Sequence, residues 1–109
     1  MGSSRHTIVL FQPYPNRSSR TYMEFDSVYQ SMDGICGLFE KRLKDSNPTV
    51  RNLTYDVSEL YEFIDALPDL SALIFDTDLQ AYVPYDRSWI KLRVYQHLKK
   101  YASQGPRSG

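Results

Sequence analysis

The side chains best suited to chemistry are few and scattered along the chain. His6 and His97 are the two histidines, and Cys36 is the single cysteine. A zinc or catalytic centre needs such residues clustered or in a pattern like HExxH, and no such grouping is present. We therefore expect no metal, no cofactor and no catalytic residue. Each histidine is interpreted as structural or solvent-facing, and Cys36 as a buried free thiol inside a helical apolar pattern.

Acidic residues cluster just after the middle of the chain, where paired carboxylates could act as a general acid and base. They follow the polar side of an amphipathic pattern whose other side is apolar, which indicates a solvated helix face. These residues are Glu59, Glu62, Asp65 and Asp69.

Basic residues gather in the last predicted helix, at Lys91, Arg93, Lys99 and Lys100. This is the one feature that favours direct RNA binding. Against it, the formal net charge is zero, and a protein that neutralises many phosphates carries excess positive charge. Cations near a helix C-terminus also complement the helix dipole, and no aromatic RNA-stacking signature accompanies them. Direct nucleic-acid binding remains the alternative interpretation.

Two short patterns could mark interaction or modification. Gly34 and Gly37 lie inside a helical pattern and not after a strand, so they do not form a phosphate-binding loop. They allow either close helix packing or a shallow patch that a partner's backbone can approach. Thr21 and Glu24 have the spacing of a helix-capping box and also of an acidophilic kinase site. Thr21 is therefore predicted to cap a helix and is a candidate phosphorylation site.

The elements that position these residues can be outlined from the periodicity. Strands are predicted at 6–12, 53–57, 70–75 and 80–84, the last two forming a hairpin. Helices are predicted from 21 to about 47, from 58 to 67 with Ser58 as the cap, and from Asp86, which caps the last helix, onwards. This βαβαββα order predicts a two-layer α+β domain over residues 6–102. Residues 1–5 are predicted to be a flexible N-terminus and residues 103–109 a disordered tail.

The first predicted strand is apolar on both faces. Ile8 and Leu10 lie on one face, and Val9 and Phe11 on the other. If the helices cover one face of the sheet, the other remains bare over an area near the largest that a soluble monomer tolerates. This predicts a homodimer formed sheet to sheet, although alternation alone does not choose the face. No apolar run approaches the roughly 20 residues that span a bilayer, and the start lacks the apolar stretch of a signal peptide, so we expect an intracellular protein without membrane contact.

In their order along the chain, several segments together resemble the enhancer-of-rudimentary family. The resemblance covers residues from about His6 to Leu98. Five residues depart from the family pattern and indicate a divergent paralogue: Phe11, Tyr14, Tyr29, Gly37 and Phe75. The segments that carry the resemblance are HTIVLFQP (6–13), RTY (20–22), LTYDVS (53–58), FID (63–65), DLS (69–71), AYVPY (81–85) and WIK (89–91).

The resemblance implies an antiparallel four-stranded sheet with three helices on one face and a homodimer through the other face. It also chooses the interface, which would contain Ile8 and Leu10. The family's known behaviour implies a non-enzymatic adaptor that binds short segments of partner proteins. Those partners would act in transcription, splicing, elimination of transcripts and small-RNA processing, in the nucleus with the cytoplasm as a further compartment.

Overall fold

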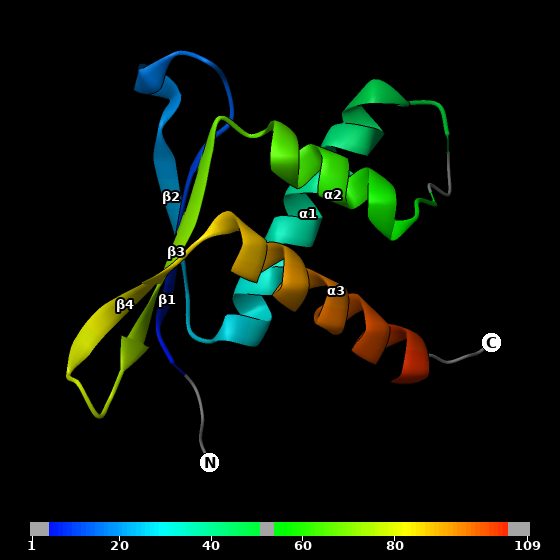
Figure 1. The fold of residues 1–109 in the computed structure, drawn as a ribbon. Coiled ribbons are helices and arrows are strands. Elements are labelled where there is room, and N and C mark those ends of the chain that lie inside the picture. The colour runs from blue at the N-terminus through cyan, green and yellow to red at the C-terminus, as the bar shows by residue number, and fades with distance from the viewer. Residues whose placement is uncertain (1–4, 51–53, 105–109) are drawn as a thin grey trace.

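The computed structural model, which describes residues 5–50 and 54–104, has a sheet on one side and helices on the other (Figure 1). Within these residues there are four strands, three α-helices and one short 3₁₀ turn. In chain order they are β1 (Thr7–Gln12), η1 (Arg17–Ser19), β2 (Thr21–Phe25), α1 (Val28–Ser46), α2 (Val57–Ala66), β3 (Asp69–Asp76), β4 (Ala81–Tyr85) and α3 (Arg87–Gln104).

The sheet has the order β2-β1-β3-β4, and every neighbouring pair is antiparallel. All three helices lie on the same side of it (Figure 1). The prediction of an α+β fold with a four-stranded antiparallel sheet and three helices is therefore confirmed. The β3–β4 hairpin is confirmed as well, and Gln80 in its turn has a positive φ of 55°.

The predicted element order is wrong in its first half, because the chain runs ββααββα. Thr21–Phe25 forms strand β2, with Met23 paired to Val9 and Phe25 to Thr7. Met23 and Phe25 alternate toward the helical layer, where they pack against the core. The two-residue alternation of apolar side chains typical of a strand therefore ends at Phe25. The three-to-four-residue spacing typical of a helix begins only at Val28. Pairing with β1 prevails over the local capping-box spacing.

Helix α1 is capped by Ser27 and not by Thr21, which corrects the sequence prediction. The Ser27 hydroxyl accepts a hydrogen bond from the Gln30 backbone N–H over 3.1 Å. Thr21 is the first residue of β2 and is exposed. A Ser with extended backbone just before the first helical turn meets the stereochemical need of an N-cap better than a residue six positions earlier.

The strand predicted at 53–57 is also wrong where the structure describes it. Residues 54–56 have no regular structure, and Val57 is the first residue of α2; residue 53 lies outside the described ranges. Asp56, rather than Ser58, caps this helix by accepting from the Glu59 N–H. The Ser58 hydroxyl donates to the same carboxylate over 2.6 Å. These two hydrogen bonds, that of Ser58 first, lower the pKa of Asp56.

The remaining boundaries agree closely with expectation. Helix α1 ends at Ser46 before the Asn47-Pro48 pair, and the Asp86 carboxylate caps α3 by accepting from the Trp89 N–H over 3.0 Å. Helix α3 continues to Gln104, two residues beyond the predicted end of the domain. The predicted N-terminal arm and C-terminal tail otherwise lie outside the described residues, apart from Arg5.

The core lies between the sheet and the helices. Val9 from β1 is fully buried there together with Leu60, Ile64, Ile90 and Val94 from α2 and α3. Arg87 joins the ends of these two helices, because its guanidinium donates to the carbonyl oxygens of Ile64 and Leu67, each over 2.7 Å. None of the described helices is both long enough and apolar enough to cross a membrane.

Candidate functional site

The sheet face turned away from the helices is largely apolar, and we call it the open face. Val9 is fully buried under the helices, whereas Leu10 beside it is 37% exposed on the open face. The register places Leu10 beside Tyr22, and Ile8 beside Leu73. The apolar members of the open face are Ile8 and Leu10 of β1, Tyr22 of β2, Leu73 and Phe75 of β3, and Tyr82 and Pro84 of β4. The same register also places two polar residues on it, Glu24 of β2 and Ser71 of β3.

A polar cluster occupies one end of the open face. His6 alternates with Ile8 and Leu10, and its imidazole bridges two strands. Nδ1 lies 2.7 Å from the Tyr82 hydroxyl, and Nε2 lies 3.1 Å from Glu24 Oε1. The Tyr82 ring also packs edge-on against Phe75, with centroids 5.2 Å apart. The open face is therefore an ordered mixture of apolar surface and satisfied polar groups. Such a composition suits a protein interface.

The two glycines predicted as a single patch have different environments. A Cβ on Gly34 would lie 2.7 Å from Cε1 of the Phe25 ring and closer still to Cζ, so this glycine permits close packing of α1 on β2. Among the described residues, and apart from the helix turns on either side of it, a Cβ on Gly37 would meet no atom within 4 Å. Close packing therefore holds for Gly34, whereas Gly37 lies at an open position of α1 and stays a candidate for partner contact.

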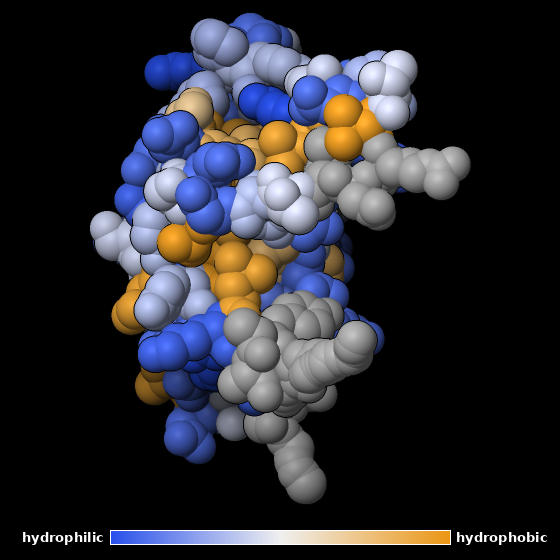
Figure 2. Space-filling view, turned by 90° about the vertical axis from the view of Figure 1, so that its right-hand side faces the viewer, coloured by the Kyte–Doolittle hydropathy of each residue, from blue (hydrophilic) through white to orange (hydrophobic). Residues whose placement is uncertain are grey.

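Gly37 lies beside a hollow between α1 and α3 that also contains the buried His97. The His97 side chain is only 3% exposed, and its Nε2 lies 3.1 Å from Asp33 Oδ1. The Tyr29 ring packs edge-on against the imidazole at 4.6 Å between centroids. One cavity of about 480 Å³ and another of about 280 Å³ lie on either side of His97. Figure 2 shows apolar surface between hydrophilic ridges on the helical side of the molecule.

Cys36 lines the larger of these cavities and is buried, as the sequence predicted. Burial, followed by the charges of Glu40 and Asp33, raises the pKa of the Cys36 thiol to about 12. Glu40 also accepts a hydrogen bond of 2.7 Å from the Tyr55 hydroxyl. Burial and this hydrogen bond raise the pKa of Tyr55. Neither group is poised for nucleophilic chemistry near neutral pH.

The basic residues of α3 do not form one continuous row. Lys91 points toward α2, where its ammonium lies 2.8 Å from the Asp65 carboxylate and 5.1 Å from the Tyr61 ring. Arg93 and Lys100 instead line the smaller cavity beside α1.

Two of the cations are paired with aromatic rings on their own helix, which sequence reasoning missed. Arg93 lies over the Trp89 ring at 5.4 Å, and Lys99 over the Tyr95 ring at 5.8 Å. The four-residue spacing between each cation and its ring could have predicted these contacts, because residues four apart on a helix are neighbours and a cation beside an aromatic ring favours cation–π contact.

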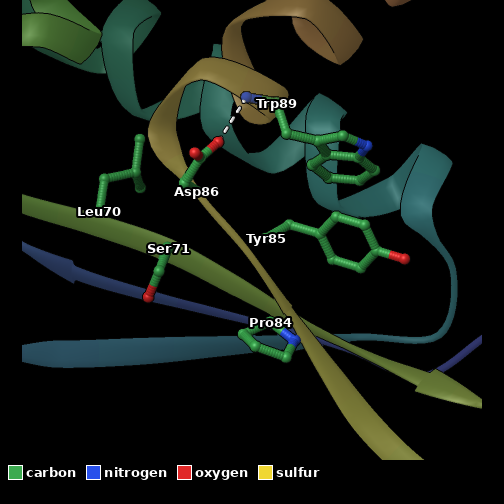
Figure 3. A pocket seen from close by; sticks show the side chains of 6 residues that line it. All are labelled: Leu70, Ser71, Pro84, Tyr85, Asp86 and Trp89. Carbon is green, nitrogen blue, oxygen red and sulfur yellow. Dashed lines mark hydrogen bonds between the residues drawn. The ribbon is translucent and has the colours of Figure 1, made fainter.

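An aromatic notch near the start of α3 was also not foreseen. Tyr85 and Trp89 lie with their ring centroids 4.3 Å apart at an angle of 34°. They border a shallow cavity of about 520 Å³ together with Leu70, Ser71, Pro84 and Asp86 (Figure 3). Its position at the end of β4 could not be read from local patterns.

The other candidate residues are surface groups. Glu59, Glu62, Asp65 and Asp69 are all exposed, as expected for a solvated face. Among the residues that the structure describes, no three His, Cys, Asp or Glu side chains are arranged to hold a metal ion.

Known proteins of one family match nearly the whole chain. A family model described as "Enhancer of rudimentary" matches residues 3–104. The enhancer of rudimentary homolog of Arabidopsis thaliana is 56% identical over 103 residues, which are 94% of this chain and 94% of the relative. That of Dictyostelium discoideum is 48% identical, covering 89% of this chain and 97% of the relative. The protein enhancer of rudimentary of Drosophila virilis is 41% identical, covering 89% and 93%.

Proposed function

Because this chain belongs to the enhancer of rudimentary family, we propose that it is a non-enzymatic homodimeric adaptor that assembles proteins of RNA processing and transcription. It would bind short segments of these proteins and hold two of them on one dimer. Its place of action would be the nucleus, and also the cytoplasm where its partners are found there. The proposal is supported chiefly by the apolar open face on a chain of this family.

Homodimerisation is the first part of the proposal, with the open face as the interface. Leu10, Tyr22 and Tyr82 are 37%, 58% and 42% exposed there. An apolar face of this kind favours contact with a second copy, because each Å² of apolar surface removed from water stabilises the complex by about 25 cal/mol. Two-fold symmetry brings the same face of both protomers together, so one patch supplies both sides of the contact.

Partner binding is the second part, and it uses surfaces that the open face leaves available. Aromatic side chains outside the open face are also solvent-exposed, among them Tyr14, Tyr29 and Tyr95. Tyrosine buries a large area with few rotatable bonds, which is why it is enriched at binding hot spots.

The test combines oligomeric state with partner identity. Light scattering on the purified chain should give twice the mass of one protomer across a range of concentrations. Affinity purification of the chain from cells, followed by mass spectrometry, should recover more proteins of RNA processing or transcription than the same purification with an unrelated control bait. A monomer in solution, or a set of enriched proteins with no connection to RNA metabolism, would contradict the proposal.

Direct RNA binding through α3 is a second candidate function, favoured by two features of this helix. Residues 87–104 contain no Asp or Glu, and two cations lie over aromatic rings. Such rings and cations can contact bases and phosphates of a single strand. A fluorescent oligouridylate should then bind with an affinity that falls steeply with salt. Absence of binding at low ionic strength would exclude this function.

A further inference from the structure

Strand β2 is one of the two outer strands of the sheet, whose order is β2-β1-β3-β4. It pairs with β1 on one side, and on its other side no strand lies among the described residues. An outer strand with free backbone groups can pair with an extended segment of another chain. The residues that turn their N–H and C=O groups outward therefore decide what this edge can bind.

The register shows which backbone groups of β2 point outward. The Phe75 N–H donates to the His6 carbonyl oxygen over 2.9 Å, so His6 bonds toward β3. Successive residues of a strand direct their backbone groups to opposite sides, so Thr7 bonds toward β2, where its partner is Phe25. None of the turn or loop residues that the structure describes bonds to the outward groups. The outward residues of β2 are Tyr22 and Glu24.

The opposite edge of the sheet is blocked. Val83 of β4 is paired with Ile74, and the same alternation makes Tyr82 and Pro84 direct their backbone groups outward. Proline has no N–H, and natural sheets place it on outer strands to prevent pairing. Strand β2 contains neither proline nor lysine, and its pairing with β1 continues without a bulge. The sheet thus has one protected edge and one open edge.

Strand β2 is also held firmly in the fold. The Phe25 ring packs against Gly34 of α1, and Met23 is partly buried against the core. On the other face of the sheet, Glu24 Oε1 lies 3.1 Å from His6 Nε2. A strand that is already ordered loses little entropy when a segment pairs with it.

The side chains along the open edge differ from end to end. Glu24 and Asp26 are exposed at the C-terminal end of β2. Arg20 lies at the other end, where its guanidinium donates to the Gln12 side chain over 2.9 Å. A basic residue beside Glu24 would form an opposite-charge pair across the strands, and an aromatic or β-branched residue would suit the exposed Tyr22.

We propose that the open edge of β2 is a docking site for a short extended segment of a partner protein, which adds a strand antiparallel to β2. Along that segment, a basic residue beside Glu24 is followed by an apolar residue beside Met23 and an aromatic or β-branched residue beside Tyr22. This inference rests on the proposed adaptor function, to which it assigns a site and a partner chemistry. The added strand lies in the plane of the sheet, so it does not replace a second copy on the open face.

Another copy of this chain is the competing occupant of the edge. With one contact through the open face and a second through β2, the copies would form an open-ended chain of molecules instead of a closed dimer. A partner segment leaves the dimer closed, with one segment on each protomer.

The probe is a phage-displayed library of random dodecapeptides, selected on the purified full-length chain. The enriched peptides should share the order basic, apolar, then aromatic or β-branched over consecutive residues. When they bind, the amide hydrogens of Tyr22 and Glu24 should exchange with solvent more slowly by NMR. Enriched peptides without this order, or slowed exchange confined to other surfaces, would overturn the proposal.

N-methylation of a selected peptide tests backbone pairing without changing the protein. Alternate N–H groups of the added strand face β2. Methylation of an amide that faces β2 should weaken binding roughly tenfold or more, whereas methylation of the next amide should change the affinity less than about threefold. Losses that do not alternate along the peptide would show that it does not bind as a strand.

A proline in β2 tests the same pairing from the protein side. Glu24→Pro removes an outward N–H but no hydrogen bond to β1, and should weaken the peptide roughly tenfold or more. Glu24→Gln keeps the N–H and should weaken it only about threefold, through the lost charge. Glu62→Gln makes that change of net charge on the exposed face of α2 and should leave the affinity unchanged. Equal affinity of the two Glu24 variants would overturn the role of the backbone.

The outcomes separate this site from the adaptor function. Peptides that bind the aromatic notch or another face would refute the β2 edge and leave the adaptor function standing. Particles heavier than a dimer that become dimers in the Glu24→Pro variant would show that the edge binds another copy, which also overturns the proposal. A monomeric chain, or one that recovers no RNA-processing proteins, would refute the adaptor function itself, whatever binds at β2.

Discussion

The Phe25 ring of β2 fills the space into which a side chain at Gly34 of α1 would project. This contact sets how closely the first helix approaches the edge strand of the sheet. Gly34→Ala should therefore destabilise the protein, because overpacking typically costs about 1–3 kcal/mol, more than the roughly 1 kcal/mol gained in helix propensity. Gly37→Ala, in open space, should gain stability by up to about 1 kcal/mol. Chemical denaturation of both variants measures the contrast, and a stabilised Gly34→Ala protein would contradict it.

Capping of α1 provides a second prediction. Ser27→Ala removes the hydroxyl that accepts from the Gln30 N–H, and should lower the free energy of unfolding by about 1 kcal/mol. Thr21→Ala is the matched control, since Thr21 lies exposed in β2 and caps nothing. It should change stability by less than about 0.5 kcal/mol. Equal losses in thermal or urea denaturation would show that Ser27 does not act as the cap.

The open face provides a third prediction, for the dimer proposed above. Ile8→Arg with Leu10→Arg should yield a monomer, because burying unpaired charges at the interface costs several kcal/mol. Light scattering reports the mass. The control is Leu79→Arg with Leu92→Arg, two leucines outside the strands, in the β3–β4 turn and in α3, that are 67% and 52% exposed. This control should remain dimeric, and a dimer in the Ile8 and Leu10 variant would assign the interface elsewhere.

Arg87 should matter for stability more than its place among the surface residues of α3 indicates. The last carbonyls of a helix have no partner within it, and the Arg87 guanidinium supplies one to Ile64 and Leu67 at the end of α2. Arg87→Ala should lower the free energy of unfolding by about 2 kcal/mol. Arg87→Lys should recover only part, since an ammonium lacks the planar fork. A neutral Arg87→Ala variant in urea titrations would contradict this role.

The thiol of Cys36 should be unreactive in the folded protein. Its pKa is raised to about 12 from a reference of 9.0, so the thiolate that attacks alkylating reagents is nearly absent at pH 8. Iodoacetamide should alkylate Cys36 in the native chain far more slowly than it alkylates the thiol of free glutathione. In denaturant, the rate of alkylation of Cys36 should rise to that of an ordinary exposed thiol. Because the charged form is disfavoured in the fold, labelling should accelerate as pH rises toward 12. Rapid native labelling at pH 8 would show that the thiol is exposed or ionised.

Much of the fold was decided by local sequence patterns. The apolar spacing of α2 and α3, the hairpin between β3 and β4, and the Asp86 cap all depend on residues close together in the chain. The absence of a clustered Cys and His pattern and the ordered family segments could likewise be read without coordinates. These features are local or cumulative along the chain, so no knowledge of distant contacts is needed to find them.

Other features were decided only by the tertiary structure. Thr21–Phe25 is short and ambiguous by itself, and pairing with β1 made it a strand despite the capping-box spacing. Alternation in β1 placed Val9 and Leu10 on opposite faces of the sheet, but the position of the helices determined which of the two is buried. Gly34 and Gly37 look alike in a helical pattern until Phe25 is placed against one of them. Asp33 and His97 are 64 residues apart, and only the packing of α1 against α3 brings their side chains into contact, because packing joins surfaces whose separation in sequence carries no periodic signal.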